Sequence, residues 1–348
     1  MNLKKYRFLP DRQTGFISDE NAKIYFSRIG ISVFVFGVAA TLVNTLLYML
    51  VSSFLPSITS NGAVIAAVNH TVSFVSIYAI AMPIFCYLLK PLPTMRPFRK
   101  KMGVKDIFGG FCVSLLFMMV GNYISNIVIV WLQTMLKTTT QNPVEEAISP
   151  SDPWTIVVTV IFMVIVGPIL EELLFRKILC DKLMALGEGY AILLSAAIFG
   201  LFHGNFYQFA YAFLLGAVFS LIYVKTGKLI YSTVYHMVIN LLGAVIGPWI
   251  LEQIDLDKLY ALMESGVVDP ADPIWQPMFL LMIYESLMTA AAVVGLVLVF
   301  KARKKGTLTL ERGILPPPRQ HRIANLFCNV GVAAAITYFV FTFVVSLL

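Results

Sequence analysis

Long apolar runs recur from one end of the 348-residue chain to the other, and they limit its fold more than any other feature. An α-helix needs about twenty predominantly apolar residues to cross the hydrocarbon core of a bilayer. In lipid the backbone must satisfy its own hydrogen bonds, which favours helices. The sequence therefore predicts an all-α, polytopic membrane protein with eight to nine transmembrane helices. The candidate spans are residues 31–55, 63–89, 107–135, 154–175, 190–203, 207–224, 229–251, 278–300 and 326–348.

The composition excludes the common soluble classes. Hydrophobic residues make up 58% of the chain and charged residues only 13%, whereas about a quarter of the residues in soluble domains are charged. The polar N-terminal stretch does not resemble a signal peptide. Four cysteines lie in or beside apolar runs without the spacing of metal ligands, so we expect reduced packing residues. They are Cys86, Cys112, Cys180 and Cys328.

Basic residues are concentrated in alternate connections between the predicted helices. Of the 26 lysines and arginines, all except Lys137 and Lys258 lie in these connections, and the opposite connections collect nine acidic residues. The positive-inside rule then places the N terminus in the cytoplasm, and the pattern fits a bacterial cytoplasmic membrane. Because the positive charge follows the topology, we expect the lipid bilayer as a partner and no nucleic acid.

The chain divides into three predicted segments. Residues 1–153 form an N-terminal tail and three transmembrane helices, and residues 154–251 form a core of four transmembrane helices. Residues 252–348 comprise an acidic outer loop, a basic inner loop and two C-terminal helices. No soluble domain is expected.

Ionisable residues inside the predicted spans are concentrated in the core segment. Such residues are costly in a membrane, so each requires a partner or a function. Glu172 and Arg176 are four residues apart on one helix face and can pair, whereas Glu171 points about 100° away from Glu172. His236 and Asn240 are also four residues apart and present an imidazole and an amide on one face.

The turn expected near Gly187 brings two of these residues to one depth. Glu171 lies 16 residues before Gly187 and His203 lies 16 residues after it, so an antiparallel hairpin holds them level. His236 lies only nine residues from Gly227 in the next turn, which is a depth mismatch. A carboxylate and a neutral imidazole that converge on one water form a general base for hydrolysis.

Two further interpretations of this set stay open. The N–H groups of His236 and Asn240 suit a developing oxyanion. Two histidines and one glutamate also form a known catalytic zinc set, here Glu171, His203 and His236, although the chain has no HExxH motif.

Three short motifs in this region resemble those of the CPBP family, the CAAX protease or Abi family of intramembrane endopeptidases. EELLFR fits EExxxR, FGLFH fits FxxxH, and HMVIN fits HxxxN, in the family's order. Each motif alone is weak, but the three in order on membrane helices are specific. The resemblance covers residues 154–249, less than a third of the chain.

The resemblance implies roles for the motif residues. Glu171 and His203 would activate the attacking water, and His236 and Asn240 would stabilise the oxyanion. The remaining motif residues would support the site: Glu172, Arg176 and Phe199. The family is often described as metalloproteases, but a glutamate mechanism requires no metal, so a divalent ion such as zinc stays an alternative.

The predicted function is therefore endoproteolysis of a membrane-associated peptide or protein. One alternative is a non-catalytic relative, such as a bacteriocin-immunity protein or a scaffold, in which the polar cluster only locks helix packing. A transporter is a third interpretation, because intramembrane Glu and His also mark ion pathways. Substrate identity, recognition of prenyl groups and oligomeric state are not specified. Other polar residues within spans are expected to pair between helices: Asn69, His70, Asn122, Asn126 and Glu285.

Overall fold

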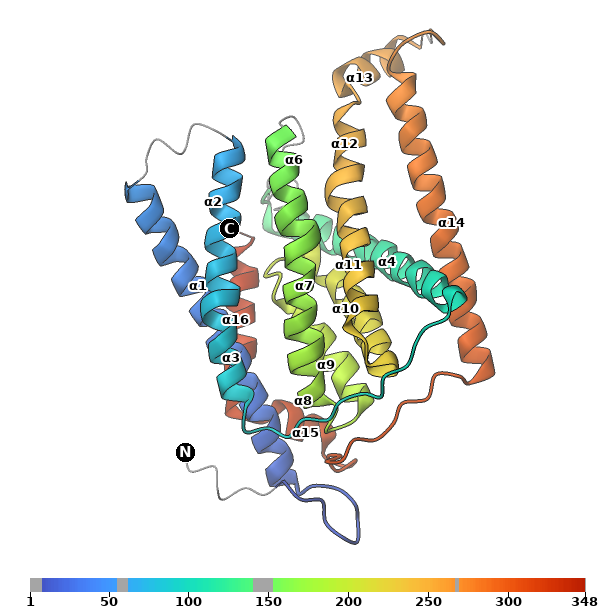
Figure 1. The fold of residues 1–348 in the computed structure, drawn as a ribbon. Helices are drawn as coiled ribbons and strands as arrows, with labels where there is room; N and C mark the ends of the chain where they lie inside the picture. Colours follow the sequence, from blue (N-terminus) through green and yellow to red (C-terminus); the bar gives the residue numbers. More distant parts are fainter. Residues whose placement is uncertain (1–7, 55–61, 140–152, 267–268, 348) are drawn as a thin grey trace.

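The structure, a computed structural model, describes residues 8–54, 62–139, 153–266 and 269–347 (Figure 1). These residues are predominantly helical, and the described ranges contain no β-strand, only an isolated antiparallel bridge between Gly187 and Arg312. The predicted all-α, polytopic membrane fold is confirmed. All four cysteines are free, as predicted, although Cys328 is exposed rather than packed.

Within the described residues, seven helices have the length and apolar composition needed to cross a membrane. They are α1 (Asp19–Phe54), α2–α3 (Val64–Leu89), α4 (Val104–Leu136), α6–α8 (Pro153–Leu183), α10 (Phe206–Thr226), α11–α12 (Leu229–Glu252) and α14 (Trp275–Lys305). Two further apolar helices are shorter: α9 (Glu188–Leu201) and α16 (Val330–Val345). Two short polar-flanked helices complete the described fold, α13 (Leu256–Ser265) and α15 (Arg322–Phe327).

The expected count of eight to nine full spans is thus corrected to seven of spanning length and two shorter helices within the described residues. With 14 residues, α9 measures only about 21 Å at 1.5 Å per residue. It ends because Gly204 has a φ of +68°, after which Asn205 caps α10 by accepting a hydrogen bond from the Gln208 backbone N–H. His203 therefore lies in a tight turn between two helices rather than inside one.

Three of the long helices contain π-helical turns immediately before a proline. The turns are Val75–Ala81, Val160–Val166 and Leu242–Ile246, which precede Pro83, Pro168 and Pro248. In each case the residue just before the proline donates its N–H to the carbonyl five residues earlier, as Gly167 does to Phe162. Since proline has no N–H and its ring crowds the preceding turn, the helix widens locally. Pro168 places such a turn one helical turn before Glu171.

The accessory helices α1 and α16 pack tightly against each other beside the core. A Cβ atom on Gly30 would lie 2.3 Å from the backbone of Gly331, and one on Gly331 would lie 1.8 Å from the Ser27 carbonyl oxygen. Only glycine permits this close backbone approach, which is typical of helix pairs in membranes. The pair closes one side of the region that holds Glu171 and His203.

Basic and acidic connections lie at opposite ends of the bundle (Figure 1). The connections 90–103 and 306–321 lie at the end where α1 begins and where α8 turns into α9, whereas α13 lies at the other end. This segregation agrees with the charge pattern. The cytoplasmic location of the N terminus stays a prediction.

Candidate active site

A buried ion pair forms the base of the candidate site. Arg176 Nε lies 3.2 Å from Glu172 Oε2, and both side chains are 0% exposed. Arg176 also donates from Nη1 to Ser195 Oγ at 3.1 Å, and Ser195 donates to the Phe175 carbonyl at 2.9 Å. The predicted pairing of Glu172 with Arg176 is therefore present, and Ser195 links it to α9.

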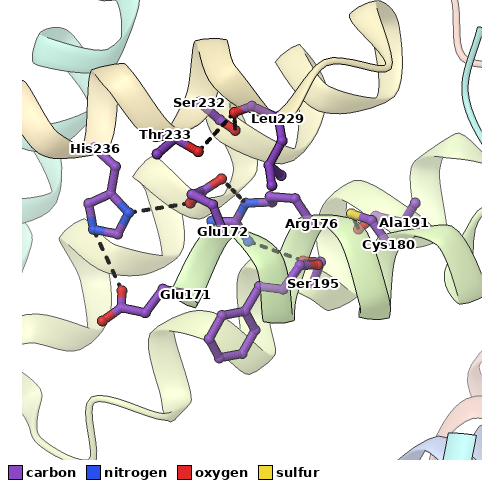
Figure 2. Close-up of polar contacts among 11 residues, drawn as sticks. Glu171, Glu172, Arg176, Cys180, Ala191, Ser195, Leu229, Ser232, Thr233 and His236 are labelled. Atoms are coloured by element: carbon purple, nitrogen blue, oxygen red, sulfur yellow. Dashed lines mark hydrogen bonds and ion pairs between the residues drawn. The ribbon is translucent and has the colours of Figure 1, made fainter. Parts of the chain in front are cut away.

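His236 lies between the two glutamates (Figure 2). Its Nδ1 atom is 3.3 Å from Glu172 Oε1, and its Nε2 atom is 3.6 Å from Glu171 Oε2. The carboxylates of Glu171 and Glu172 point apart, as the helix geometry predicts. The imidazole of His236 nevertheless contacts both, one at each of its two nitrogens. The expected depth mismatch of His236 does not separate it from Glu171, and Figure 1 shows the α8 to α9 turn extending further toward its end of the bundle than α11 (Leu229–Leu241).

His203 is fixed in one tautomer by its backbone partner. Its Nδ1 atom lies 2.9 Å from the Phe199 carbonyl oxygen. A carbonyl can only accept, so Nδ1 carries the proton and, in the neutral ring, Nε2 is an unprotonated acceptor. His203 and Glu171 line the same cavities, which agrees with the depth match predicted from sequence.

Phe199 on α9 packs against both histidines of the site. Its ring centroid lies 5.0 Å from that of His203 and 5.8 Å from that of His236, with edge-to-face geometry at both. The guanidinium of Arg176 lies 4.8 Å from the same ring centroid. Phe199 thus separates the buried cation from the cavity, which is a structural basis for the FxxxH motif.

The side-chain amide of Asn240 already forms one hydrogen bond within the fold. Its Nδ2 group donates to the Met163 carbonyl oxygen at 2.8 Å. That carbonyl belongs to the π-helical turn before Pro168, where wider hydrogen bonding leaves acceptors for side chains. Because an amide NH₂ has two hydrogens, one donor of Asn240 is committed to the fold and the other can serve the cavity it lines.

Two cavities meet at Glu171, Phe199 and His203. The larger, about 460 Å³, extends between α4, α10 and α11, and we call it the polar cavity. It is also lined by His236 and Asn240. The second, about 340 Å³, extends toward α1 and α16. A substrate segment can therefore reach His203 and His236 from the α4 side of the polar cavity. The accessory helices α1 and α16 close the opposite side.

Three residues beside the site had no functional role predicted from the sequence. Tyr78 lies beside the Glu171 carboxylate in the second cavity. Asn122 and Asn126 line the polar cavity from α4, and neither forms a hydrogen bond with any described residue. The expectation that they pair between helices is therefore wrong for the described ranges. Their spacing of four residues on an otherwise apolar helix was the available signal, but it does not distinguish packing from a cavity.

Two other polar residues within the predicted spans, His70 and Glu285, differ in whether they have a partner. His70 stacks on the Phe162 ring with centroids 5.4 Å apart, so it has the structural partner expected for it. Glu285 is exposed on α14 and has no ion pair within the described chain. It does not line the cavities at the candidate site.

The residues present do not fit a metal site. In the described ranges, no three His, Cys, Asp or Glu side chains converge closely enough to hold a metal ion. The zinc set of Glu171, His203 and His236 therefore gains no support from this arrangement.

Comparisons with known proteins converge on the segment that holds these residues. Residues 153–242 match the family model described as type II CAAX prenyl endopeptidase Rce1-like. The membrane-embedded CAAX protease MroQ of Staphylococcus aureus (strain USA300) is 35% identical over 88 residues, which cover 23% of this chain and 36% of MroQ. The match thus spans about a third of that relative. No solved structure matches the chain.

The matched residues extend from α6 to the end of α11, and they include every motif residue discussed above. The chain is an integral membrane protein by its seven spanning helices and by its membrane-embedded bacterial relative. Residues 153–242 are therefore similar to the CPBP family of CAAX protease-like proteins.

Proposed function

We propose that this protein is an intramembrane endopeptidase that hydrolyses a peptide bond of a membrane-associated peptide or protein. The observation that carries the proposal is that Glu171, His203, His236 and Asn240 line one polar cavity between membrane helices. We further propose a bacterial cytoplasmic membrane with the N terminus in the cytoplasm, on the basis of the charge pattern.

In the proposed reaction, Glu171 and His203 activate a water molecule in the cavity. The water donates one hydrogen bond to the Glu171 carboxylate and one to the unprotonated Nε2 of His203. Glu171 removes a proton as the water oxygen bonds to the peptide carbonyl carbon, and the carbonyl π electrons move to the oxygen. The oxyanion then re-forms the C=O bond, the C–N bond breaks with its electrons leaving on nitrogen, and the proton held by Glu171 passes to that nitrogen.

We propose that His236 and Asn240 stabilise the oxyanion as this proton transfer takes place. Two carboxylates face the ring nitrogens of His236, and a bare nitrogen lone pair would repel either of them. We therefore assign a proton to each nitrogen, which balances two anions with two cations, Arg176 and His236. When Glu171 takes a proton from water, its carboxylate becomes neutral and attracts the Nε2–H of His236 less strongly. That N–H can then donate a hydrogen bond to the oxyanion.

The substrate is found by comparing peptide termini in host membranes that contain the wild type or the Glu171→Ala variant at equal levels. We expect a small set of new termini that depend on Glu171. The matched control is Glu285→Ala, which removes a carboxylate on α14 that lies outside the site, and it should give the wild-type termini. Identical termini in wild type and Glu171→Ala would contradict the proposal and favour an immunity or scaffold role.

Metal removal should leave the activity unchanged. Among the described residues, no three His, Cys, Asp or Glu side chains lie close enough together to hold a metal ion. We expect the reconstituted protein to cleave its substrate at the same rate before and after treatment with 1,10-phenanthroline, measured by mass spectrometry of the products. Loss of cleavage that returns on addition of Zn²⁺ would contradict this prediction.

Asn122 and Asn126 are expected to bind the substrate backbone. A peptide that is extended for cleavage in a membrane exposes N–H and C=O groups that need partners, and an amide side chain can donate to one and accept from the other. Replacing both residues with leucine should raise KM about tenfold with little change in kcat, as for the loss of one to two hydrogen bonds.

The control for this pair is Asn69→Leu, because Asn69 is an exposed amide on α2 (Gly62–Phe74) outside both cavities at the site. It should leave KM unchanged. An unchanged KM in the double variant of Asn122 and Asn126, or a loss confined to kcat, would show that these amides do not bind substrate.

A further inference from the structure

A third cavity lies at the basic end of the bundle, away from the candidate active site. Its volume is about 440 Å³, and it is enclosed by α9, α15 and residues 307–321, which we call the strap. The strap follows α14 and crosses below the turn between α8 and α9 (Figure 1). Three arginines line this cavity: Arg312 and Arg319 of the strap and Arg322 of α15.

Backbone hydrogen bonds hold the strap against the turn between α8 and α9. Leu315 donates its N–H to the Ala185 carbonyl at 2.7 Å, and Glu188 donates its N–H to the Glu311 carbonyl at 3.1 Å. A Cβ atom on Gly313 would lie 2.2 Å from the Ala185 oxygen, so only glycine fits there. Backbone contacts therefore hold the part of the strap that lines the cavity in a fixed position.

A side chain of α10 and the backbone just before α1 fix the strap further. Lys225 at the end of α10 forms an ion pair with Glu188 and donates to the Thr309 carbonyl at 2.6 Å. Near the start of α1, Ile17 donates its N–H to the Pro316 carbonyl at 3.1 Å. Both ends of the strap are thus anchored, and the arginines have a defined place relative to α9.

The three arginines are not neutralised by the described parts of the chain. None of their guanidinium groups forms an ion pair or a hydrogen bond there, and Arg312 instead lies over the Phe16 ring at 5.7 Å. The only acidic residue among the lining residues is Glu311, so the cavity is positively charged. The Tyr190 hydroxyl, also in the lining, is buried without a hydrogen-bond partner among the described residues.

The opposite wall of the cavity is apolar. Leu193 on α9 and Ile323 on α15 are 57% and 77% exposed, and further leucines of α9 and α15 continue the same wall. A soluble anion would use only the arginines. A ligand that uses both walls must join a negative group to a hydrocarbon chain, and a basic cavity beside membrane helices is where lipid head groups bind.

We propose that this cavity binds one anionic phospholipid, with its phosphate at Arg319 and Arg322 and an acyl chain along Leu193. Arg312 borders the same head group from the strap. The site is independent of the proposed protease activity, because it shares no lining residue with the two cavities that meet at Glu171. The lipid would link the strap to α9, the helix that leads to His203.

The test is native mass spectrometry of the full chain in detergent, after removal of co-purified lipid, with added phosphatidylglycerol. We expect one phosphatidylglycerol to be retained per chain by the wild type. Converting Arg319 and Arg322 to glutamine should weaken its binding at least about tenfold, since two basic residues near the head group are lost. Phosphatidylcholine should bind more weakly than phosphatidylglycerol to the wild type.

The matched control changes Arg303 and Lys304 to glutamine, which removes the same charge at the end of α14 but outside the cavity. It should retain wild-type affinity. Thermal unfolding checks that all variants are folded, which is expected because Arg319 and Arg322 are exposed. Equal weakening in both double variants would overturn the site, as would equal binding of phosphatidylcholine. Displacement of the lipid by millimolar inorganic phosphate would indicate a soluble-anion site and overturn the lipid assignment.

Discussion

Replacing Glu171 with glutamine should abolish cleavage, with a loss of about a thousandfold or more in kcat for the substrate found in membranes. The amide has nearly the shape of the carboxylate but cannot take a proton from water. Because Glu171 is only partly buried and its carboxylate faces His236 at 3.6 Å, the substitution should leave the fold unchanged. The measurement is the initial rate of product formation by purified protein, at equal amounts of folded enzyme.

A matched substitution separates the chemical role of Glu171 from a general effect of lost charge. Glu285→Gln removes a carboxylate from α14 and should cleave at the wild-type rate. Cleavage by Glu171→Gln within tenfold of the wild type would show that another group acts as the base.

Replacing Glu172 with alanine should destabilise the protein by about 3–5 kcal/mol, the usual effect of removing one partner of a buried ion pair. Glu172 and Arg176 are both 0% exposed, so the variant leaves a guanidinium in the interior without its anion. Neither Ser195 nor the Phe199 ring can supply the missing charge. The measurement is the free energy of unfolding in mixed micelles, followed by circular dichroism.

A double variant tests whether the uncompensated charge is the cause. Glu172→Leu combined with Arg176→Met removes both charges and should recover most of the lost stability, because similar replacements of buried pairs are often neutral. It should not recover activity, since His236 loses its contact with Glu172. A double variant as unstable as Glu172→Ala would contradict this cause, and Glu264→Ala, an exposed site on α13, should have no effect.

The general fold follows from the sequence because apolar length and charge alternation report directly on the bilayer. All nine predicted segments are helical within the described ranges, but α9 and α16 are too short to count as full spans. The end of α9 depends on the left-handed conformation of Gly204 and on the cap at Asn205, which are local backbone effects that hydropathy does not register. The π-helical turns before Pro168 and Pro248 have a sequence cause, but their effect on hydrogen bonding appears only in the structure.

The motif residues of the candidate site were predictable from the sequence, but their contacts were not. Helix periodicity predicts the pair of Glu172 and Arg176 because both lie on one helix. The position of His236 between two carboxylates depends on how α11 packs against α7 (Gly167–Glu172), which no local pattern encodes. Likewise, Asn122 contributes to the polar cavity only through the packing of α4 against α10.

The most direct test of the central claim is cleavage by the purified chain alone, reconstituted in lipid vesicles with the substrate identified from membranes. We predict that the wild type releases the two products with the termini found in cells, and that His203→Ala and Glu171→Gln release neither. Absence of cleavage by folded wild-type protein, with the same substrate cleaved in cells that contain it, would contradict the claim that this chain is itself the protease.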